Sequence, residues 1–366
     1  MKIAQIAPLL ESVPPRLYGG TERVVSYLTE ELAHRGHEVT LFASGDSLTS
    51  ASLVPCSPQA LRLSAKSRDP VPHTLLLLEK VKRRIAQFDV LHFHADLLHL
   101  PIFRPFASRT LTTLHGRLDL PGLRAVYSEY ADMPLISISN SQRLPVPRAH
   151  WLATVMHGIP ASLMRYTAEP RGDYLAFLGR ISPEKGPETA IAIAKAVGIR
   201  IRIAAKVDPA DKNYFEYNVQ PLLDHPLIEW TGEIGENRKS EFLGNARALL
   251  FPIDWPEPFG LVMIEAMACG TPVIAFRRGS VPEIIEDGVN GFVVETAAGA
   301  IEAIRRLDAL DRARVRACFE RRFTAARMAD DYIRVYEALA PVPRLQRHHI
   351  GEERPRGQEG IRRLNA

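Results

Sequence analysis

The chain alternates short runs of apolar residues with longer stretches in which apolar residues recur every three or four positions. The short runs predict buried strands, and the longer stretches predict amphipathic helices. Strands that alternate with helices in this way form parallel sheets covered by helices on both faces. The pattern therefore predicts an α/β protein built from doubly wound units.

The first predicted unit runs from a strand at Lys2–Pro8 through a proline- and glycine-containing loop to a helix that opens at Thr21. Thr21 is a favourable N-cap residue, and Glu22 places a carboxylate near the helix N-terminus. The further elements predicted in this half are a strand at His37–Ala43, a helix at Thr74–Phe88 and strands at Val90–His94, Thr110–Leu114 and Leu135–Ser139.

An irregular segment, Pro160–Asp173, separates these elements from a second series. That series comprises predicted strands at Tyr174–Leu178, Arg200–Ala205, Leu227–Thr231, Ala248–Pro252 and Pro272–Ala275, and helices at Pro187–Val197 and Gly260–Ala268. We therefore expect two domains, at residues 1–162 and 163–324. A helix at 325–340 follows them, and the proline- and arginine-rich residues 341–366 are expected to form a disordered tail.

Composition narrows the class of protein. The chain has 366 residues, 46% of them hydrophobic and 24% charged, which is typical of soluble globular proteins. The formal net charge of +4 comes largely from the tail, and no basic stripe interleaved with aromatic residues indicates nucleic-acid binding. Three scattered cysteines favour a reducing cytosol, and no run approaches the ~20 apolar residues of a membrane span. We expect a cytoplasmic protein.

One predicted strand ends in a loop that carries two cations. Arg180 follows Gly179, and Lys185 precedes Gly186, at the carboxyl end of a strand where doubly wound domains bind ligands. An arginine fork and a mobile lysine can together neutralise a diphosphate. A solvated loop is the alternative explanation of this pair considered alone.

A second loop, before the helix at Thr21, contains Gly19 and Gly20. Adjacent glycines allow the backbone to approach a ligand closely. The sequence contains neither GxGxxG nor GxxxxGK[ST], so neither a dinucleotide cofactor nor a P-loop is indicated.

Two glutamates bracket the start of a predicted helix. Glu257, Pro258 and Gly260 form the loop before it, and Glu265 lies within it. Free backbone N–H groups at a helix N-terminus bind anions, and carboxylates beside them can accept hydrogen bonds from sugar or ribose hydroxyls. Two ordinary surface glutamates are the alternative explanation of the pair alone.

The order of these motifs resembles the family 4 retaining glycosyltransferases. The similarity rests on Tyr18-Gly19-Gly20-Thr21-Glu22, Thr113-Leu114-His115-Gly116, Gly179-Arg180, Glu184-Lys185-Gly186, Glu257 through Glu265, Ala266 through Ile274, and Pro282-Glu283-Ile284-Ile285. The resemblance implies the GT-B fold, in which two Rossmann-like domains face a central cleft. The N-terminal domain would bind the acceptor and the C-terminal domain the nucleotide sugar, and the helix at 325–340 would cross back to the N-terminal domain.

The resemblance also implies a role for each matching residue. Arg180 and Lys185 would hold the donor diphosphate, and Glu265 would bind the ribose hydroxyls. Glu257 would contact the transferred sugar, with His115 beside it, and these two residues with Arg180 and Lys185 form the expected catalytic set. Further donor contacts are expected from Gly19, Gly20, Phe259, Gly260 and Leu261.

No metal or cofactor is expected, because cationic side chains and a helix N-terminus would neutralise the leaving diphosphate. The absence of an Asp-x-Asp motif agrees with this. The cluster of His92, His94, Asp96 and His99 invites a metal-site interpretation. Because only His92 and His94 share one face of the predicted strand, we favour histidines that line the cleft or the core.

Three positions stay open. His157 stands where many family members have asparagine, and Ser280 stands where a second glycine is common. The basic residues from Lys80 to Arg84 form either a solvated helix face or a peripheral contact with an anionic membrane.

The sequence thus predicts a retaining hexosyltransferase that moves a sugar from a nucleotide-diphosphate sugar to a hydroxyl acceptor, either a glycan, a lipid or a small molecule. A nucleotide-sugar epimerase or hydrolase of the same fold and a non-catalytic nucleotide-sugar-binding protein are the alternatives. The residues do not specify the donor base, the sugar, the acceptor or the oligomeric state.

Overall fold

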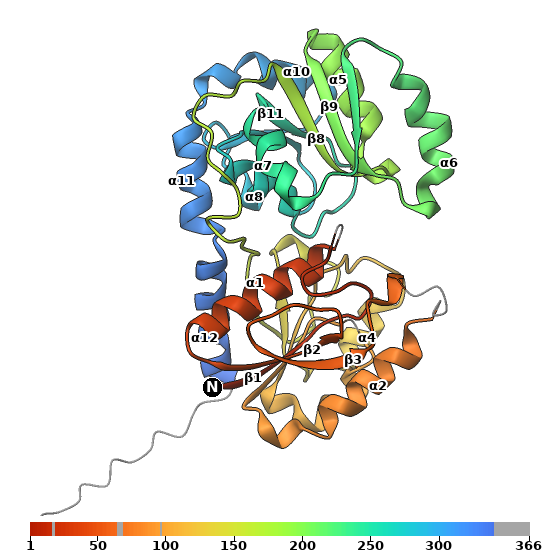
Figure 1. Ribbon diagram of the computed structural model, residues 1–366, viewed down its shortest axis with the longest axis vertical. Coiled ribbons are helices and arrows are strands. Elements are labelled where there is room, and N and C mark those ends of the chain that lie inside the picture. Colours follow the sequence, from red (N-terminus) through yellow and green to blue (C-terminus); the bar gives the residue numbers. More distant parts are fainter. Residues whose placement is uncertain (17–18, 64–68, 96, 340–366) are drawn as a thin grey trace, which may run out of the picture.

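The computed structural model describes residues 1–16, 19–63, 69–95 and 97–339. Two parallel sheets, each flanked by helices, form two bodies stacked along the long axis of the molecule (Figure 1). This arrangement confirms the predicted α/β class and the two doubly wound units. Tyr18 and Asp96, which the sequence analysis named, lie outside the described residues.

The N-terminal sheet has seven strands in the order β3-β2-β1-β4-β5-β6-β7. The chain reverses its direction of winding between β1 and β4, and doubly wound sheets bind ligands at such a point. The strands are β1 (Lys2–Ile6), β2 (Glu38–Ser44), β3 (Ser52–Ser57), β4 (Val90–Phe93), β5 (Thr110–Thr113), β6 (Leu135–Ser137) and β7 (Trp151–Thr154).

The C-terminal sheet has six strands in the order β10-β9-β8-β11-β12-β13, with the same reversal between β8 and β11. β11 is buried along its whole length and β8 over its first four residues, which agrees with their apolar sequences. The strands are β8 (Tyr174–Arg180), β9 (Arg200–Lys206), β10 (Ile228–Gly232), β11 (Ala248–Phe251), β12 (Val273–Phe276) and β13 (Gly291–Val294).

The helices cover both faces of each sheet. In the N-terminal body they are α1 (Gly20–His34), α2 (Val71–Lys82), α3 (Leu100–Phe103) and α4 (Leu123–Glu129). In the C-terminal body they are α5 (Pro187–Val197), α6 (Lys212–Tyr214), α7 (Glu236–Gly244), α8 (Leu261–Ala268), α9 (Val281–Ile284), α10 (Ala297–Arg305) and α11 (Arg312–Arg322).

The last described helix, α12 (Ala325–Leu339), returns to the N-terminal body and packs beside α1 (Figure 1). Its Tyr332 and Tyr336 are fully buried against the first sheet. The chain crosses between the two bodies twice, near Ile159 and before α12. These two segments are hydrogen-bonded to each other, since Ile159 N donates to Phe323 O at 3.0 Å and Ala325 N donates to Ile159 O at 2.8 Å. These bonds make both crossings one compact junction.

Two predicted details are wrong. Helix α1 begins at Gly20 with Gly19 as its N-cap residue, so Thr21 lies inside the helix and caps nothing. Helix α2 spans Val71–Lys82, and a separate 3₁₀ turn at Ile85–Gln87 replaces the end of the helix predicted at Thr74–Phe88. Proline early in α2 is compatible with a first helical turn, which explains the earlier start.

The junction predicts a requirement for glycine at position 158. A Cβ atom there would lie 2.2 Å from Thr324 O and 2.9 Å from Ala325 N, both backbone atoms that cannot rotate away. We expect Gly158→Ala to lower the free energy of unfolding by about 3 kcal/mol, as overpacking does at rigid sites. Gly116→Ala is the matched control, because nothing lies within 4 Å of the added Cβ. Equal urea midpoints for the two variants would contradict this account of the junction.

Candidate active site between the two bodies

A cavity of about 450 Å³ lies between the two bodies, at the carboxyl ends of their strands. Loops after β1 and β5 line it from the N-terminal body, and loops after β8 and β11 line it from the C-terminal body. The structure brings all of the predicted site residues to its wall: Gly19, Gly20, His115, Arg180, Lys185, Glu257, Phe259, Gly260, Leu261 and Glu265.

The loop from Glu257 to Gly260 is held by backbone geometry and by a neighbouring turn. Gly260 has φ +83 and is the N-cap residue of α8, so the left-handed conformation turns the loop into the helix. Ser280 N donates to Glu257 O at 2.9 Å, and Ser280 Oγ donates to Phe259 O at 2.9 Å. Ser280 therefore supports this loop directly, a role that the sequence left open.

Glu257 and Glu265, which are both buried in the wall of the cavity, each have a lysine partner. Glu257 is 8% exposed, and its Oε2 accepts from Lys185 Nζ at 2.5 Å and from Trp255 Nε1 at 2.9 Å. Glu265 is 4% exposed, and its Oε1 accepts from Lys239 Nζ at 2.8 Å. A buried carboxylate without a cation would be costly, so these pairs offset the cost of burial and orient both side chains.

Arg180, at the end of β8, is surrounded by carboxylates. It pairs with Glu184 at 2.5 Å, with Asp211 at 3.5 Å and with Asp208 at 3.8 Å. Lys206, at the end of β9, also pairs with Asp208, at 2.8 Å. A diphosphate that binds Arg180 must therefore compete with acidic side chains of the same loop cluster.

In the N-terminal body the backbone at Gly19 lies close to Pro15, and two side chains of this body contact the opposite wall of the cavity. A Cβ on Gly19 would lie 2.7 Å from Pro15 Cβ, so only glycine fits there. Arg23 of α1 forms an ion pair with Glu236 of α7, and the guanidinium of Arg117 lies 5.5 Å from the ring centre of Trp255. These contacts join the two walls of the cavity.

Three histidines form the inner end of the site. The His115 ring stacks on that of His157 with centres 5.2 Å apart, and His157 packs edge-on against Phe259 at 4.9 Å. Nε2 of His115 lies 2.9 Å from Nδ1 of His94. Burial lowers the pKa of His115 to about 3 and holds the pKa values of His94 and His157 well below their ordinary range. All three rings are therefore neutral near pH 7.

Sequence reasoning missed His157, Lys239 and Arg23 as members of the site. His157 adjoins the junction between the bodies, and Lys239 reaches Glu265 from α7. Lys239 stands in an ordinary polar helix sequence, and only the packing of α7 beside α8 distinguishes it. His157 carried a signal, because it departs from the asparagine usual in the family.

The histidines of the predicted cluster are hydrogen-bonded to other side chains of the protein. His92 lies in β4 and His94 directly follows it, with ring centres 4.0 Å apart. Their nitrogens are engaged with protein groups, since His92 lies 2.7 Å from Tyr336 Oη and 2.8 Å from Thr113 Oγ1. Among the described residues, no group of three histidine, cysteine, aspartate or glutamate side chains could hold a metal ion.

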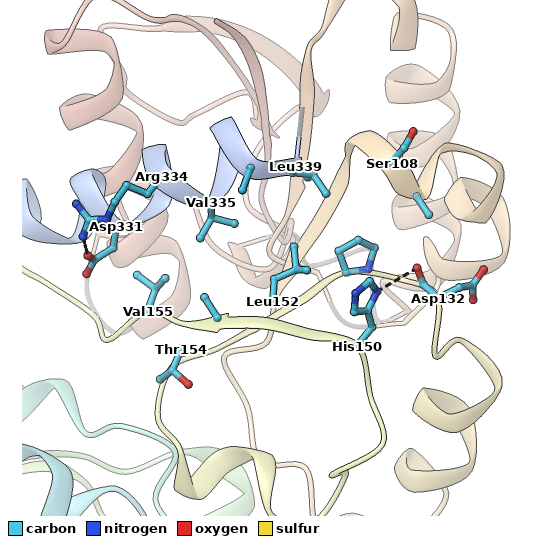
Figure 2. A pocket seen from close by; sticks show the side chains of 14 residues that line it. Ser108, Asp132, His150, Leu152, Thr154, Val155, Asp331, Arg334, Val335 and Leu339 are labelled. Carbon is cyan, nitrogen blue, oxygen red and sulfur yellow. Dashed lines mark hydrogen bonds and ion pairs between the residues drawn. The ribbon is translucent and has the colours of Figure 1, made fainter. Parts of the chain in front are cut away.

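A second cavity, of about 610 Å³, lies apart from the predicted residues, between β7 and the end of α12. Figure 2 shows Leu152 and Val335 facing each other across it, with an ion pair between Asp331 and Arg334 at one end. At the other end His150 lies within hydrogen-bond reach of Asp132 O, at 3.4 Å. The wall of this groove is mostly aliphatic, and it contains no glutamate–lysine pair like those of the first cavity.

In the described part of the chain no helix has the length and apolar character needed to span a bilayer. At the basic end of α2, two of the four cations have partners within the protein. Lys80 Nζ donates to Pro55 O at 2.6 Å, and Arg83 pairs with Glu79 at 2.9 Å. Lys80 and Arg83 are therefore already held by protein groups.

Family models match most of the chain in two parts. The model described as Glycosyltransferase Family 4 matches residues 18–160, and the model described as Glycosyl transferases group 1 matches residues 165–316. Among curated proteins, D-inositol 3-phosphate glycosyltransferase of Mycolicibacterium smegmatis is 25% identical, with 76% of this chain and 75% of that protein covered. Phosphatidyl-myo-inositol mannosyltransferase of Mycobacterium leprae is 26% identical, with 93% and 97% covered.

Solved structures give the same result for the fold. AviGT4, a glycosyltransferase involved in avilamycin A biosynthesis, matches 93% of this chain and 98% of its own length, with a TM-score of 0.69 and 25% identity. Sucrose-phosphate synthase from Thermosynechococcus elongatus matches 93% and 99%, with a TM-score of 0.74 and 20% identity, and this likeness concerns the fold alone. The two facing bodies and the pocket between them define a GT-B glycosyltransferase. The chain belongs to the group 1 glycosyltransferases, family 4.

The buried, neutral histidines should make the folded protein less stable as the pH falls. Burial lowers the pKa of His99 and of His115 to about 3, so neither ring takes up a proton in the folded protein near pH 5. In the unfolded chain each takes up a proton below pH ~6.5, so stability falls by about 1.4 kcal/mol per pH unit for each such ring as the pH drops from there. We expect the melting temperature to fall from pH 7 to pH 5 while the imidazole NMR signals of both residues stay unshifted. Titration of these signals near pH 6.5 would contradict the prediction.

Proposed function

We propose that this glycosyltransferase moves a hexose from a nucleotide-diphosphate sugar to a hydroxyl acceptor, with retention of the anomeric configuration and without a metal ion. The observation that carries the proposal is the pairing of two buried glutamates with cations around the N-terminus of α8. Glu257 and Glu265 lie before and within this helix, and Arg180 and Lys185 face the same cavity.

The proposed diphosphate site combines a helix N-terminus with mobile cations. The first turn of α8 has backbone N–H groups without helical partners, and these groups favour an anion. Lys185 pairs with Glu257 and lies 4.8 Å from the ring centre of Trp255, and its flexible side chain lets the ammonium group turn toward a bound phosphate. Arg180 and Lys206 would close the other side, after partial release from Asp208.

The two glutamates suit hydroxyl groups on either side of that diphosphate. A carboxylate accepts hydrogen bonds only, and a pair of sugar hydroxyls can donate to its two oxygens. Glu265, deep beside α7, would accept from the ribose, and Glu257, at the mouth of α8, would accept from the transferred sugar. Neither glutamate acts as acid or base in this proposal.

The proposed reaction is a front-face displacement. The acceptor oxygen forms a bond to the anomeric carbon on the face from which the diphosphate departs, while the bond from that carbon to the phosphate oxygen breaks. The acceptor hydroxyl gives its proton to the departing phosphate oxygen. The products are the glycoside and a nucleoside diphosphate. The charge that develops on the diphosphate is met by Lys185, Arg180 and the α8 N-terminus, which is the role that a divalent ion plays in other transferases.

The relatives suggest where to look for the acceptor. The names of the two mycobacterial proteins contain inositol phosphate and phosphatidyl-myo-inositol, both of which carry ring hydroxyls. We include these two compounds among the acceptors to be tested and propose no further identity.

The direct test incubates the protein with labelled UDP-, GDP- and ADP-hexoses and a set of hydroxyl acceptors, with and without EDTA. A labelled glycoside with the anomeric configuration of the donor, formed equally in EDTA, supports the proposal. Epimerised or hydrolysed donor, or binding without turnover, would replace it with one of the alternative functions. A sugar trapped covalently on Glu257 would rule out the front-face reaction.

Two substitutions should separate binding from turnover. We expect Glu265→Ala to weaken donor binding by about 10–100-fold, because charged hydrogen bonds contribute about 1.5–3 kcal/mol. We expect Lys185→Ala to lower kcat by about 100-fold, because its cation meets charge that develops on the leaving group. Calorimetry with the donor and steady-state rates measure the two effects.

Exposed residues of the same body provide the controls. Glu302 pairs with Arg305 on the surface of α10, and Lys195 is exposed on α5. Alanine at either position should change binding and kcat less than twofold, since surface pairs contribute little. If the site variants behave like these two controls, the donor site is misplaced.

A further inference from the structure

A strip of polar side chains is buried under the active site, within an otherwise apolar face of the first sheet. Ile3, Val90 and Leu111 belong to the hydrophobic cluster under α1 and α12. Two residues further along the same faces of β1, β4 and β5 come Gln5, His92 and Thr113, all 0–1% exposed. The polar strip therefore lies at the carboxyl ends of these strands, between α12 and the cavity.

These side chains form a continuous hydrogen-bonded chain from α12 to His115. Gln5 Nε2 donates to Tyr336 Oη at 3.0 Å, and Gln5 Oε1 lies 2.7 Å from His94 Nε2. His94 Nδ1 in turn lies 2.9 Å from His115 Nε2. A branch runs from Tyr336 through His92 and Thr113 to Tyr332 Oη, with distances of 2.7, 2.8 and 2.9 Å.

With the Gln5 amide nitrogen toward Tyr336 and its oxygen toward His94, the chemistry of the groups determines where the protons lie. An amide oxygen only accepts, so His94 Nε2 must carry a proton and donate it to Gln5 Oε1. A neutral His94 then has a lone pair at Nδ1, and His115 must donate to it from Nε2. A neutral His115 that is protonated at Nε2 has its lone pair at Nδ1. Buried neutral imidazoles agree with the lowered pKa of His94 and of His115.

The series of hydrogen-bonded side chains ends at His115, in the wall of the cavity. Nδ1 of His115 is buried and has no hydrogen-bond partner among the described residues. A buried acceptor without a partner costs about 1–3 kcal/mol, and a ligand hydroxyl that reaches it would remove that cost. His115 lines the proposed donor cavity, and its ring is held flat against His157.

We propose that Gln5 is a positioning residue that fixes the tautomer of His115 through His94, so that His115 meets the bound ligand as a hydrogen-bond acceptor at Nδ1. In the structure the Gln5 amide nitrogen donates to Tyr336 Oη, which leaves the amide oxygen to accept from His94. The part that concerns the ligand rests on the proposed function, whereas the tautomer is a property of the protein alone. If the Gln5 amide faced the other way, each bond from Gln5 to His115 would reverse and His115 would be protonated at Nδ1.

The first test is ¹⁵N NMR of the histidine side chains in the full-length protein at pH 7. His115 is assigned by the signals that disappear in His115→Gln. We expect its Nε2 in the range of a protonated nitrogen and its Nδ1 in the range of an unprotonated one. A protonated Nδ1 in the unmodified protein overturns the proposal.

The second test removes the acceptor from position 5. Methionine has a similar length, and its thioether is only a weak acceptor, so Gln5→Met frees His94 and should give His115 a mixture of tautomers. Tyr332→Phe is the matched control, because Tyr332 is equally buried and bonds Thr113 on the branch that does not lead to His115. An unchanged tautomer of His115 in Gln5→Met overturns the proposal, and so does a change as large in Tyr332→Phe.

Kinetics test the consequence for the ligand. With a donor that the protein turns over, Gln5→Met should lower kcat/KM by about tenfold, the value of one neutral hydrogen bond. Tyr332→Phe, with a similar loss in melting temperature, should stay within about twofold. Equal losses in both variants would mean that the network only stabilises the fold. If no donor is turned over at all, the proposed function fails, and the NMR result still decides the tautomer.

Discussion

A carboxylate removed from water needs a cation close by, and the pairing of Glu257 with Lys185 meets this need at the centre of the active site. The two residues are far apart in the sequence, one after β11 and the other after β8, and the ion pair at 2.5 Å holds their loops together. Breaking such a buried pair by removing one partner is costly. The shape of the cavity therefore depends on this contact.

The loop around Glu257 is determined by local geometry as well as by charge. The positive φ at Gly260 turns the chain into α8, and Ser280 bonds both Glu257 O and Phe259 O. The consequence is a helix N-terminus that points into the cavity with a glutamate at its entrance. This arrangement lets one short segment provide both an anion site and a hydroxyl acceptor.

The N-terminal body is coupled to the site through α12. This helix crosses from the C-terminal body, packs beside α1 and places Tyr336 against Gln5 and His92. The junction beside it is tight, since Gly158 touches the backbone at Thr324. One helix therefore contacts both the junction between the bodies and the hydrogen-bonded residues beneath the active site.

Sequence patterns were sufficient for the class of fold, and together with the family resemblance they identified part of the wall of the cavity. Periodicity located most strands to within a few residues. The segment from Glu257 to Glu265 was predicted as a loop followed by a helix, because glycine and proline mark such turns. The start of α1 was misplaced, because Gly19 takes the N-cap position without a side-chain bond. Edge strand β7 was not predicted, since its half-exposed residues lack a buried run.

The contacts between distant segments could not be predicted in the same way. Lys239 reaches Glu265 only because α7 packs beside α8, and His157 meets His115 only because the junction folds against β5. Such contacts follow from the arrangement of the two bodies and leave no periodic mark in the sequence.

A crystal structure with a bound nucleoside diphosphate would test the central claim most directly. The diphosphate used should be the one of UDP, GDP and ADP that raises the melting temperature most. Our account predicts the phosphates at the N-terminus of α8 between Arg180 and Lys185, with the ribose hydroxyls at Glu265. A nucleotide in the groove of Figure 2, or phosphates away from α8, would contradict it.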